Sequence, residues 1–215
     1  MSEFVRALSV FFLSGLSAVF AQNVLVGRGM GMENISRTDE EREGIVFCAI
    51  QAACSVLSGV FFWLIWKYLL PRLTFLTSFG LSPYYAKAYL WPLAIALCVS
   101  LAYFMIFVCV VKLAPYDAVM PAMARLPWAC FNTFIAGVLM LSASKSYGFL
   151  EMLGFSLGSS LGYFIADLYA RAGERKLRKR EMPPAFEGLP ASLLYLSGLA
   201  LAAYAIIGHR LSGLI

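Results

Sequence analysis

Hydrophobic positions along this chain gather in six long segments that are separated by shorter polar connections. The segments occupy residues 4–26, 44–70, 89–111, 118–143, 147–170 and 189–208. Each can supply the roughly 20 residues that a helix needs to cross the hydrocarbon core of a bilayer. The pattern predicts an all-α membrane protein with six transmembrane helices.

The composition agrees with a lipid environment. Hydrophobic residues make up 61% of the chain and charged residues 13%, against roughly 25% charged residues in ordinary soluble domains. The mean hydropathy is +0.78. A length of 215 residues predicts a single integral membrane domain over residues 1–215. The net charge of +5 is interpreted through its distribution along the chain, and no nucleic-acid partner is expected.

Lysine and arginine are distributed unequally between the two sides of the predicted membrane domain. The connections at 27–43, 112–125 and 171–182 hold eleven of the 17 basic residues. Because basic residues accumulate in cytoplasmic loops, these connections are predicted to be cytoplasmic and both termini to lie outside. The predicted location is the inner (plasma) membrane, with multiple passes.

Two of the apolar segments are interrupted. In the fourth, Pro127 and Asn132 precede Gly137, and prolines recur at 115, 121 and 127. Each proline removes a backbone donor and disfavours helix at the preceding residue, so we expect a short helix, a break and then a membrane half-helix. In the first, Gln22 and Asn23 interrupt the apolar run.

Three spans separate the two interrupted segments. The chain therefore divides into halves of about 1–111 and 112–215, whose orientations are opposite because three is odd. Inverted repeats with broken helices are typical of sites that lie near the bilayer midplane, where the repeats meet. Gln22, Asn23, Pro127, Asn132, Thr133 and Gly137 are the candidate residues of such a site.

The remaining candidates for chemistry are few. No nucleophilic triad, nucleotide-binding glycine loop or zinc-ligand spacing occurs, so neither catalytic residues nor a metal site is predicted. All five cysteines lie inside predicted spans, and no disulfide is expected; only Cys130 lies close to the break. Asp167 precedes Arg171 by four residues, which predicts a local ion pair.

At the interrupted segments the chain resembles the Rnf/Nqr membrane subunits, and within them the RnfA/NqrE type. The resemblance extends over nearly the whole chain and is strongest from Phe149 onwards. Its motifs are Gln22-Asn23-Val24-Leu25-Val26, Leu126-Pro127 with Asn132 and Gly137, Gly154-Phe155-Ser156, Glu174-Arg175, and the turn Met182-Pro183-Pro184-Ala185-Phe186-Glu187-Gly188.

The resemblance implies a six-helix subunit of two inverted three-helix repeats. Such a subunit pairs with a sister subunit of opposite topology, within an ion-translocating complex that moves electrons. It also implies a [2Fe-2S] cluster at the midplane, held by one cysteine from each half-helix, four in all from the pair.

Both of these cysteines are missing here. Thr133 follows Asn132 where the resemblance implies a cysteine, and residues 27–33 offer the methionines Met30 and Met32. Neither a hydroxyl nor a thioether replaces a thiolate at iron. Cys130, about one turn before Thr133, is the one candidate for binding the cofactor.

Two interpretations stay open. In the first, the chain is a subunit of an Rnf/Nqr-type ion-translocating electron-transport complex, without catalytic residues of its own and with no cofactor held by this chain alone. In the second, it is a divergent, redox-inactive homologue that transports an ion or a small solute.

Overall fold

The structure, a computed structural model, describes residues 3–34, 41–69, 72, 83–113, 115–178, 183 and 189–211. Within these residues every regular element is a helix. In chain order they are α1 (Glu3–Val19), α2 (Val24–Arg28), the short 3-10 helix η1 (Met32–Asn34), α3 (Glu41–Leu64), its π-helical continuation η2 (Ile65–Leu69), α5 (Pro83–Leu113), α6 (Tyr116–Cys130), α7 (Thr133–Ser144), α8 (Phe149–Arg178) and α9 (Leu189–Leu211).

Three of the described helices are long and apolar enough to cross a membrane: Gly44–Tyr68, Leu90–Leu113 and Phe149–Gly173. The bent pair Val119–Cys130 and Thr133–Ser144, with 44° between its halves, is a fourth if it counts as one span. These ranges match the second, third, fifth and fourth predicted segments. The chain is thus an all-helical, multi-pass membrane protein with three or four candidate spans among its described residues.

The first and last predicted segments differ from the other four. Helix α1 ends at Val19, so it has only 17 residues, and the apolar part of α9 covers Leu193–Ala205. The first segment does not continue as one helix because the backbone leaves the helical path at residues 20–23. Six complete spans therefore remain a prediction.

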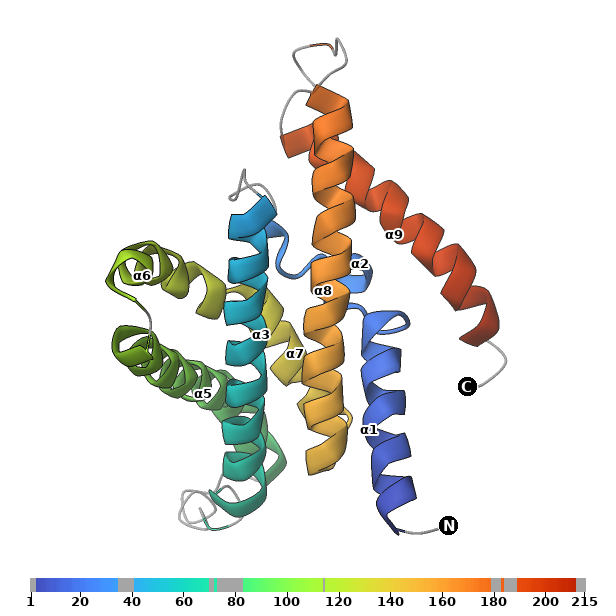
Figure 1. The fold of residues 1–215 in the computed structure, drawn as a ribbon. Helices are drawn as coiled ribbons and strands as arrows, with labels where there is room; N and C mark the ends of the chain where they lie inside the picture. The colour runs from blue at the N-terminus through green and yellow to red at the C-terminus, as the bar shows by residue number, and fades with distance from the viewer. Residues whose placement is uncertain are drawn as a thin grey trace.

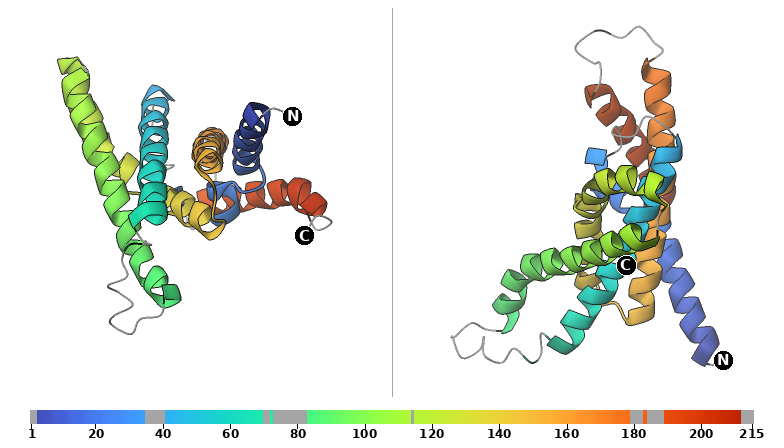
Figure 2. Two further views of the ribbon diagram at one scale, coloured as in Figure 1. Left: turned by 90° about the horizontal axis from the view of Figure 1, so that it is seen from below. Right: turned by 60° about the vertical axis from the view of Figure 1, so that its left-hand side comes forward.

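Helices α1, α3 and α8 run side by side, and α5 crosses α3 at a steep angle (Figures 1 and 2). The short α2 and the start of α7 lie alongside the middle part of α8 rather than at its ends (Figure 1). The two interrupted segments thus meet about halfway along α8, which has 30 residues.

Helix α1 packs against α8 through a row of glycines. A Cβ atom built on Gly154 or Gly158 would overlap the backbone carbonyls of Phe11 and Gly15. Small residues spaced by four let two membrane helices approach until their backbones touch, and this contact replaces the hydrophobic driving force that lipid removes.

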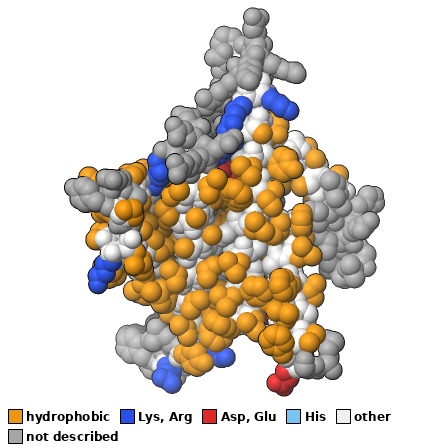
Figure 3. All heavy atoms as spheres, in the orientation of Figure 1, with side chains coloured by type: hydrophobic (Ala, Val, Ile, Leu, Met, Phe, Trp, Pro, Cys, Tyr) orange, Lys and Arg blue, Asp and Glu red, His pale blue; other side chains and the backbone are white. Residues whose placement is uncertain are grey.

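Much of the face in view is hydrophobic, as expected for lipid-facing helices, and the coloured charges lie mainly at its margins (Figure 3). One charged pair is buried: the guanidinium of Arg171 lies 2.7 Å from the carboxylate of Asp167. The predicted ion pair is confirmed. All five cysteines are free, as predicted.

Candidate functional site

The first break is organised by Asn23. Its side-chain oxygen accepts hydrogen bonds from the amides of Leu25 and Val26, both at 3.1 Å, and its amide nitrogen donates to the carbonyl of Val19 at 3.0 Å. One side chain therefore bonds a carbonyl at the C-terminal end of α1 and two amides at the N-terminal end of α2. This explains why a polar amide stands within an apolar segment.

The second break is organised in the same way by Asn132. Its oxygen accepts from the amide of Ile135 at 3.0 Å, and its nitrogen donates to the carbonyls of Ala129 at 3.1 Å and Trp128 at 3.4 Å. Asn23 and Asn132 thus each join the end of one helix to the start of a half-helix.

The prolines do not cause this break. Pro121 and Pro127 lie inside α6, which continues to Cys130, and the interruption follows at Phe131 and Asn132. A proline removes only one donor, while the carbonyl of Pro127 still accepts from the amide of Phe131 at 2.8 Å. The expected short helix, break and half-helix are present as α6, residues 131–132 and α7, and the prolines lie before the break and not in it.

The half-helices α2 and α7 contact each other where Gly137 has no side chain. A Cβ atom at Gly137 would lie 2.9 Å from Val24 of α2 and would overlap the thioether of Met30. The side chain of Met30 therefore packs against α7 at Gly137, between the first and the fourth apolar segments. Gly31 follows with a positive φ of 94°, and its carbonyl accepts a hydrogen bond from Tyr163 of α8 at 3.1 Å.

The chemistry of the site lies at the first residue of α7. The hydroxyl of Thr133 accepts from the amide of Gly31 at 2.7 Å and donates to the carboxylate of Glu33 at 2.9 Å. The backbone amide of Thr133 also donates to Glu33, at 2.8 Å. We call residues 31–33 together with Thr133 the α2–α7 junction. The negative charge of Glu33 lies at the positive end of the α7 dipole, where it is stabilising.

Gln22, just after α1, connects that helix to the turn between α7 and α8. Its amide nitrogen donates to Ser17 at 3.0 Å, and its oxygen accepts from the hydroxyl of Tyr147 at 3.4 Å. Burial raises the pKa of Tyr147 above its ordinary value, so its hydroxyl stays protonated at neutral pH and remains a donor.

Cys130 differs from the junction residues in its surroundings. It is fully buried and lies close to the thiol of Cys54 on α3, whereas Glu33 and Thr133 are exposed at the protein surface. Among the described residues, no group of three or more histidine, cysteine or acidic side chains could hold a metal ion.

The junction offers a carboxylate and a hydroxyl, which suit hard cations and protons and not iron–sulfur ligation. A [2Fe-2S] cluster therefore does not fit the donors that this chain presents there.

The sequence interpretation named Met30 and Met32 only as residues that cannot replace a cysteine, and it gave no role to Glu33. One signal was available: Glu33 is the only carboxylate in residues 27–33. An acidic side chain near a break in an apolar segment is a candidate to bond the first amides of a half-helix. Of the predicted site residues, Thr133 and Gly137 on α7 contact the first interrupted segment, at Gly31 and Glu33 and at Val24 and Met30. Asn23 and Asn132 cap the half-helices from their own segments, Gln22 bonds to Ser17 and Tyr147, and Pro127 lies exposed on α6.

Comparison with known proteins places these observations in context. No family model matches the chain. It is 22% identical over 198 residues to the A-type subunit of a Na⁺-translocating ferredoxin:NAD⁺ oxidoreductase complex from Acetobacterium woodii, an alignment that covers 91% of this chain and 96% of the relative. The chain is a homologue of such subunits.

Two further relatives match a shorter part. The A-type subunit of an ion-translocating oxidoreductase complex from Aromatoleum aromaticum is 32% identical over 83 residues, which are 39% of this chain and 43% of the relative. The E-type subunit of a Na⁺-translocating NADH-quinone reductase from Chlamydia pneumoniae is 28% identical over 87 residues, or 40% of this chain and 34% of the relative. These two alignments span less than half of each relative. The homologues are all subunits of ion-translocating electron-transport complexes.

Apart from Pro183, the turn at 182–188 that carried part of the resemblance lies outside the described residues.

Proposed function

We propose that this chain is an inner-membrane subunit of an Rnf/Nqr-type ion-translocating electron-transport complex, and that it pairs with a sister subunit of opposite topology through the α2–α7 junction. The proposal includes six spans, inverted halves and both termini outside. The observation that carries it is the junction itself, in which two half-helices meet around an exposed carboxylate.

The depth of this carboxylate is the main argument. Gly31 is bonded to Tyr163, which lies near the middle of the span Phe149–Gly173. Glu33 therefore lies far from both ends of that span. A charged carboxylate at the bilayer centre costs about 2.5–3.5 kcal/mol on insertion scales, so a protein partner or a water-filled path is expected to cover it.

Aromatic side chains near the junction support a protein partner. Trp128 and Phe131 are each 52% exposed, one on α6 and the other at the break. Aromatic residues are enriched among the energetically dominant contacts of protein interfaces. In the proposed complex they flank the junction on the face that the sister subunit covers.

Purification of the tagged chain from its native membranes in mild detergent tests the pairing. A second six-helix subunit and flavin-bearing partners are expected to co-purify. Phe131→Ala should reduce their recovery, whereas Phe12→Ala, at a side chain that is 63% exposed on α1, should not. Recovery of the chain alone, or equal loss with both variants, argues against the pairing.

A second function is favoured by the oxygen donors. In this alternative the chain is a redox-inactive homologue that moves an ion or small solute through the junction, with Glu33 as the group that binds a cation or proton. A reduced [2Fe-2S] electron paramagnetic resonance signal lost on Cys130→Ser would argue against it. Uptake into vesicles by the metal-free chain, abolished by Glu33→Gln, would support it over the first function.

A further inference from the structure

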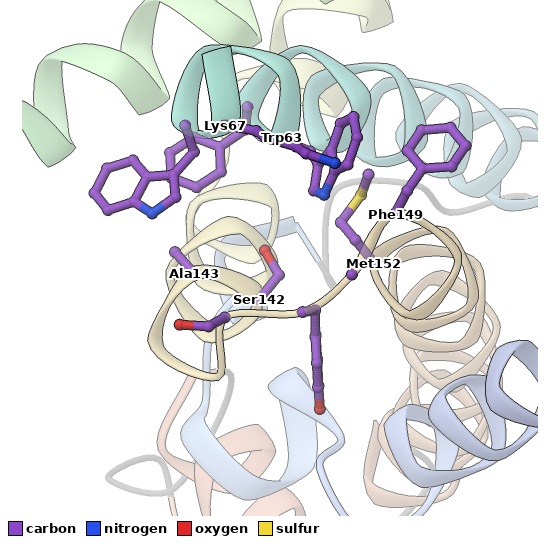
Figure 4. Close-up of a pocket in the computed structure, with 11 residues that line it drawn as sticks. Trp63, Lys67, Ser142, Ala143, Phe149 and Met152 are labelled. Atoms are coloured by element: carbon purple, nitrogen blue, oxygen red, sulfur yellow. The ribbon is translucent and has the colours of Figure 1, made fainter. Parts of the chain in front are cut away.

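A hollow lies at the end of α7 opposite to Thr133, where α3 and η2 face the turn between α7 and α8. Its volume is about 360 Å³, which falls within the range of about 300–1,000 Å³ for small-molecule sites. Trp63 and Lys67 approach it from one side, and Ser142, Ala143, Phe149 and Met152 from the other (Figure 4). The hollow is therefore formed by segments that are far apart in sequence.

Five of the 11 residues that line it are aromatic. Trp66 is stacked on Phe62, with ring centroids 5.5 Å apart and 17° between the planes, and Trp63 contacts Phe149 at 5.0 Å. Trp66 is also stacked on Trp91 at 5.9 Å, behind the wall. Aromatic pairs in stacked or tilted geometry gain about 0.5–1.5 kcal/mol beyond burial of their area. A flat ring can use this gain, whereas a flexible acyl chain cannot.

One cation lies at the edge of the hollow. The ammonium of Lys67 is 4.5 Å from the ring centroid of Trp63 and 5.6 Å from that of Tyr68. Among the residues that the structure describes, its partners are these rings and no carboxylate. The nearby carboxylate of Glu151 accepts a hydrogen bond from the amide of Gly148 at 2.7 Å. The positive charge of Lys67 is thus free to attract an anion.

An aromatic belt at the membrane interface, with snorkelling lysines, accounts for tryptophan and lysine at the end of a span. It does not account for a hollow of about 360 Å³ that segments distant in sequence line together. Tyr147, which also lines the hollow, is kept neutral by its burial, so it does not cancel the lysine charge.

We propose that this hollow binds a small amphiphile with a flat ring and one anionic oxygen group, the ring lying among Trp63, Trp66 and Phe149 and the anion on Lys67. The site is independent of the pairing proposed above, because none of its residues belongs to the α2–α7 junction.

Pyrene-1-sulfonate is a suitable probe, since it is flat, anionic and accepts energy from tryptophan. The full chain is placed in nanodiscs of zwitterionic lipid, and tryptophan-sensitised pyrene emission is titrated against empty nanodiscs. We expect a saturable component of about one probe per chain. Pyrene-1-methanol, which lacks the charge, should bind about tenfold more weakly, the effect of one charge-assisted contact.

Three variants locate the probe. Lys67→Gln should weaken sulfonate binding about tenfold and remove the preference over the neutral probe. Lys145→Gln deletes the same charge nearby, at a residue that contacts the ring of Tyr147 from outside the hollow, and should leave binding unchanged. Ala143→Phe fills the hollow and should abolish saturable binding of both probes.

Uptake that rises linearly without saturation would overturn the proposal, as would saturable binding that survives both Lys67→Gln and Ala143→Phe. Equal weakening by Lys67→Gln and Lys145→Gln would overturn the role of Lys67. Because Lys67 is exposed, its variant should fold even if Ala143→Phe does not, and circular dichroism checks both.

Discussion

Replacing Thr133 by valine tests the α2–α7 junction directly. The change keeps the branched shape of the side chain and removes its hydroxyl. Gly31 is buried, and its amide donates to that hydroxyl at 2.7 Å. In Thr133→Val this buried amide loses its acceptor, and Glu33 loses a donor at 2.9 Å.

The expected loss follows from these two bonds. A buried donor left without a partner costs about 1–3 kcal/mol. The bond to Glu33 adds less, because both its groups are exposed and solvent replaces the donor. We therefore expect Thr133→Val to lower the free energy of unfolding by about 2 kcal/mol. Thr133→Ser keeps the hydroxyl and should lose well under half of that.

Reversible unfolding in mixed detergent–SDS micelles, followed by circular dichroism, measures these differences. Thr133→Ser serves as the matched control, because it differs from Thr133→Val in keeping the oxygen. If the valine variant is as stable as the parent chain, the hydroxyl does not hold the two segments together. If serine and valine are equally destabilising, the methyl group and not the hydrogen bonds stabilises the junction.

Three further predictions concern the fold around the site. Gly158→Ala should destabilise the chain by about 1–3 kcal/mol in the same unfolding assay, because the new methyl group meets the backbone of α1. The control Gly198→Ala has open space around it and should be neutral or stabilising by up to about 1 kcal/mol. Equal effects of the two variants would contradict the close packing of α1 against α8. Asp167→Asn should cost about 3–5 kcal/mol, because it removes the carboxylate from a buried ion pair, and an unchanged unfolding midpoint would argue against burial. Glu33→Cys combined with Thr133→Cys should give a cross-linked peptide on mild oxidation, detectable by mass spectrometry. If no cross-link forms, residues 33 and 133 are not in contact as described.

Local signals were sufficient to predict several features. Long apolar runs predicted spans that match three helices and one bent pair, since the length needed to cross a bilayer is fixed by its thickness. Asn23 and Asn132 stood out because an amide in an apolar run requires partners. Both turn out to supply caps to neighbouring backbone groups, within four residues in either direction. Such short-range bonds depend mainly on nearby sequence.

Other features depended on contacts between distant parts of the chain. Glu33 contacts Thr133 across 100 residues, and no periodicity within residues 27–34 encodes that distance. The prolines of α6 show the reverse case, because a strong local signal did not decide the structure. The helix continues through Pro121 and Pro127 and ends just before Asn132, whose side chain bonds to backbone groups on both sides of the break. Gly154 and Gly158 carried a visible four-residue spacing, but their partner α1 could be identified only from the packed helices.

The two asparagine caps also suggest how this site can change its chemistry without losing its form. Asn23 and Asn132 cap the starts of α2 and α7 and bond back to the ends of α1 and α6, so hydrogen bonds within the chain hold these ends of the half-helices. A metal-binding thiolate and a hydrogen-bonded pair such as Glu33 and Thr133 can then occupy the same junction on the same backbone. The acidic member gains from the dipole of α7, and its bonds to Thr133 tie the first half of the chain to the second. The absence of cysteine at residues 27–33 and 133 is thus compatible with the broken helices, and the oxygen donors make proton or cation transfer the chemistry to test first.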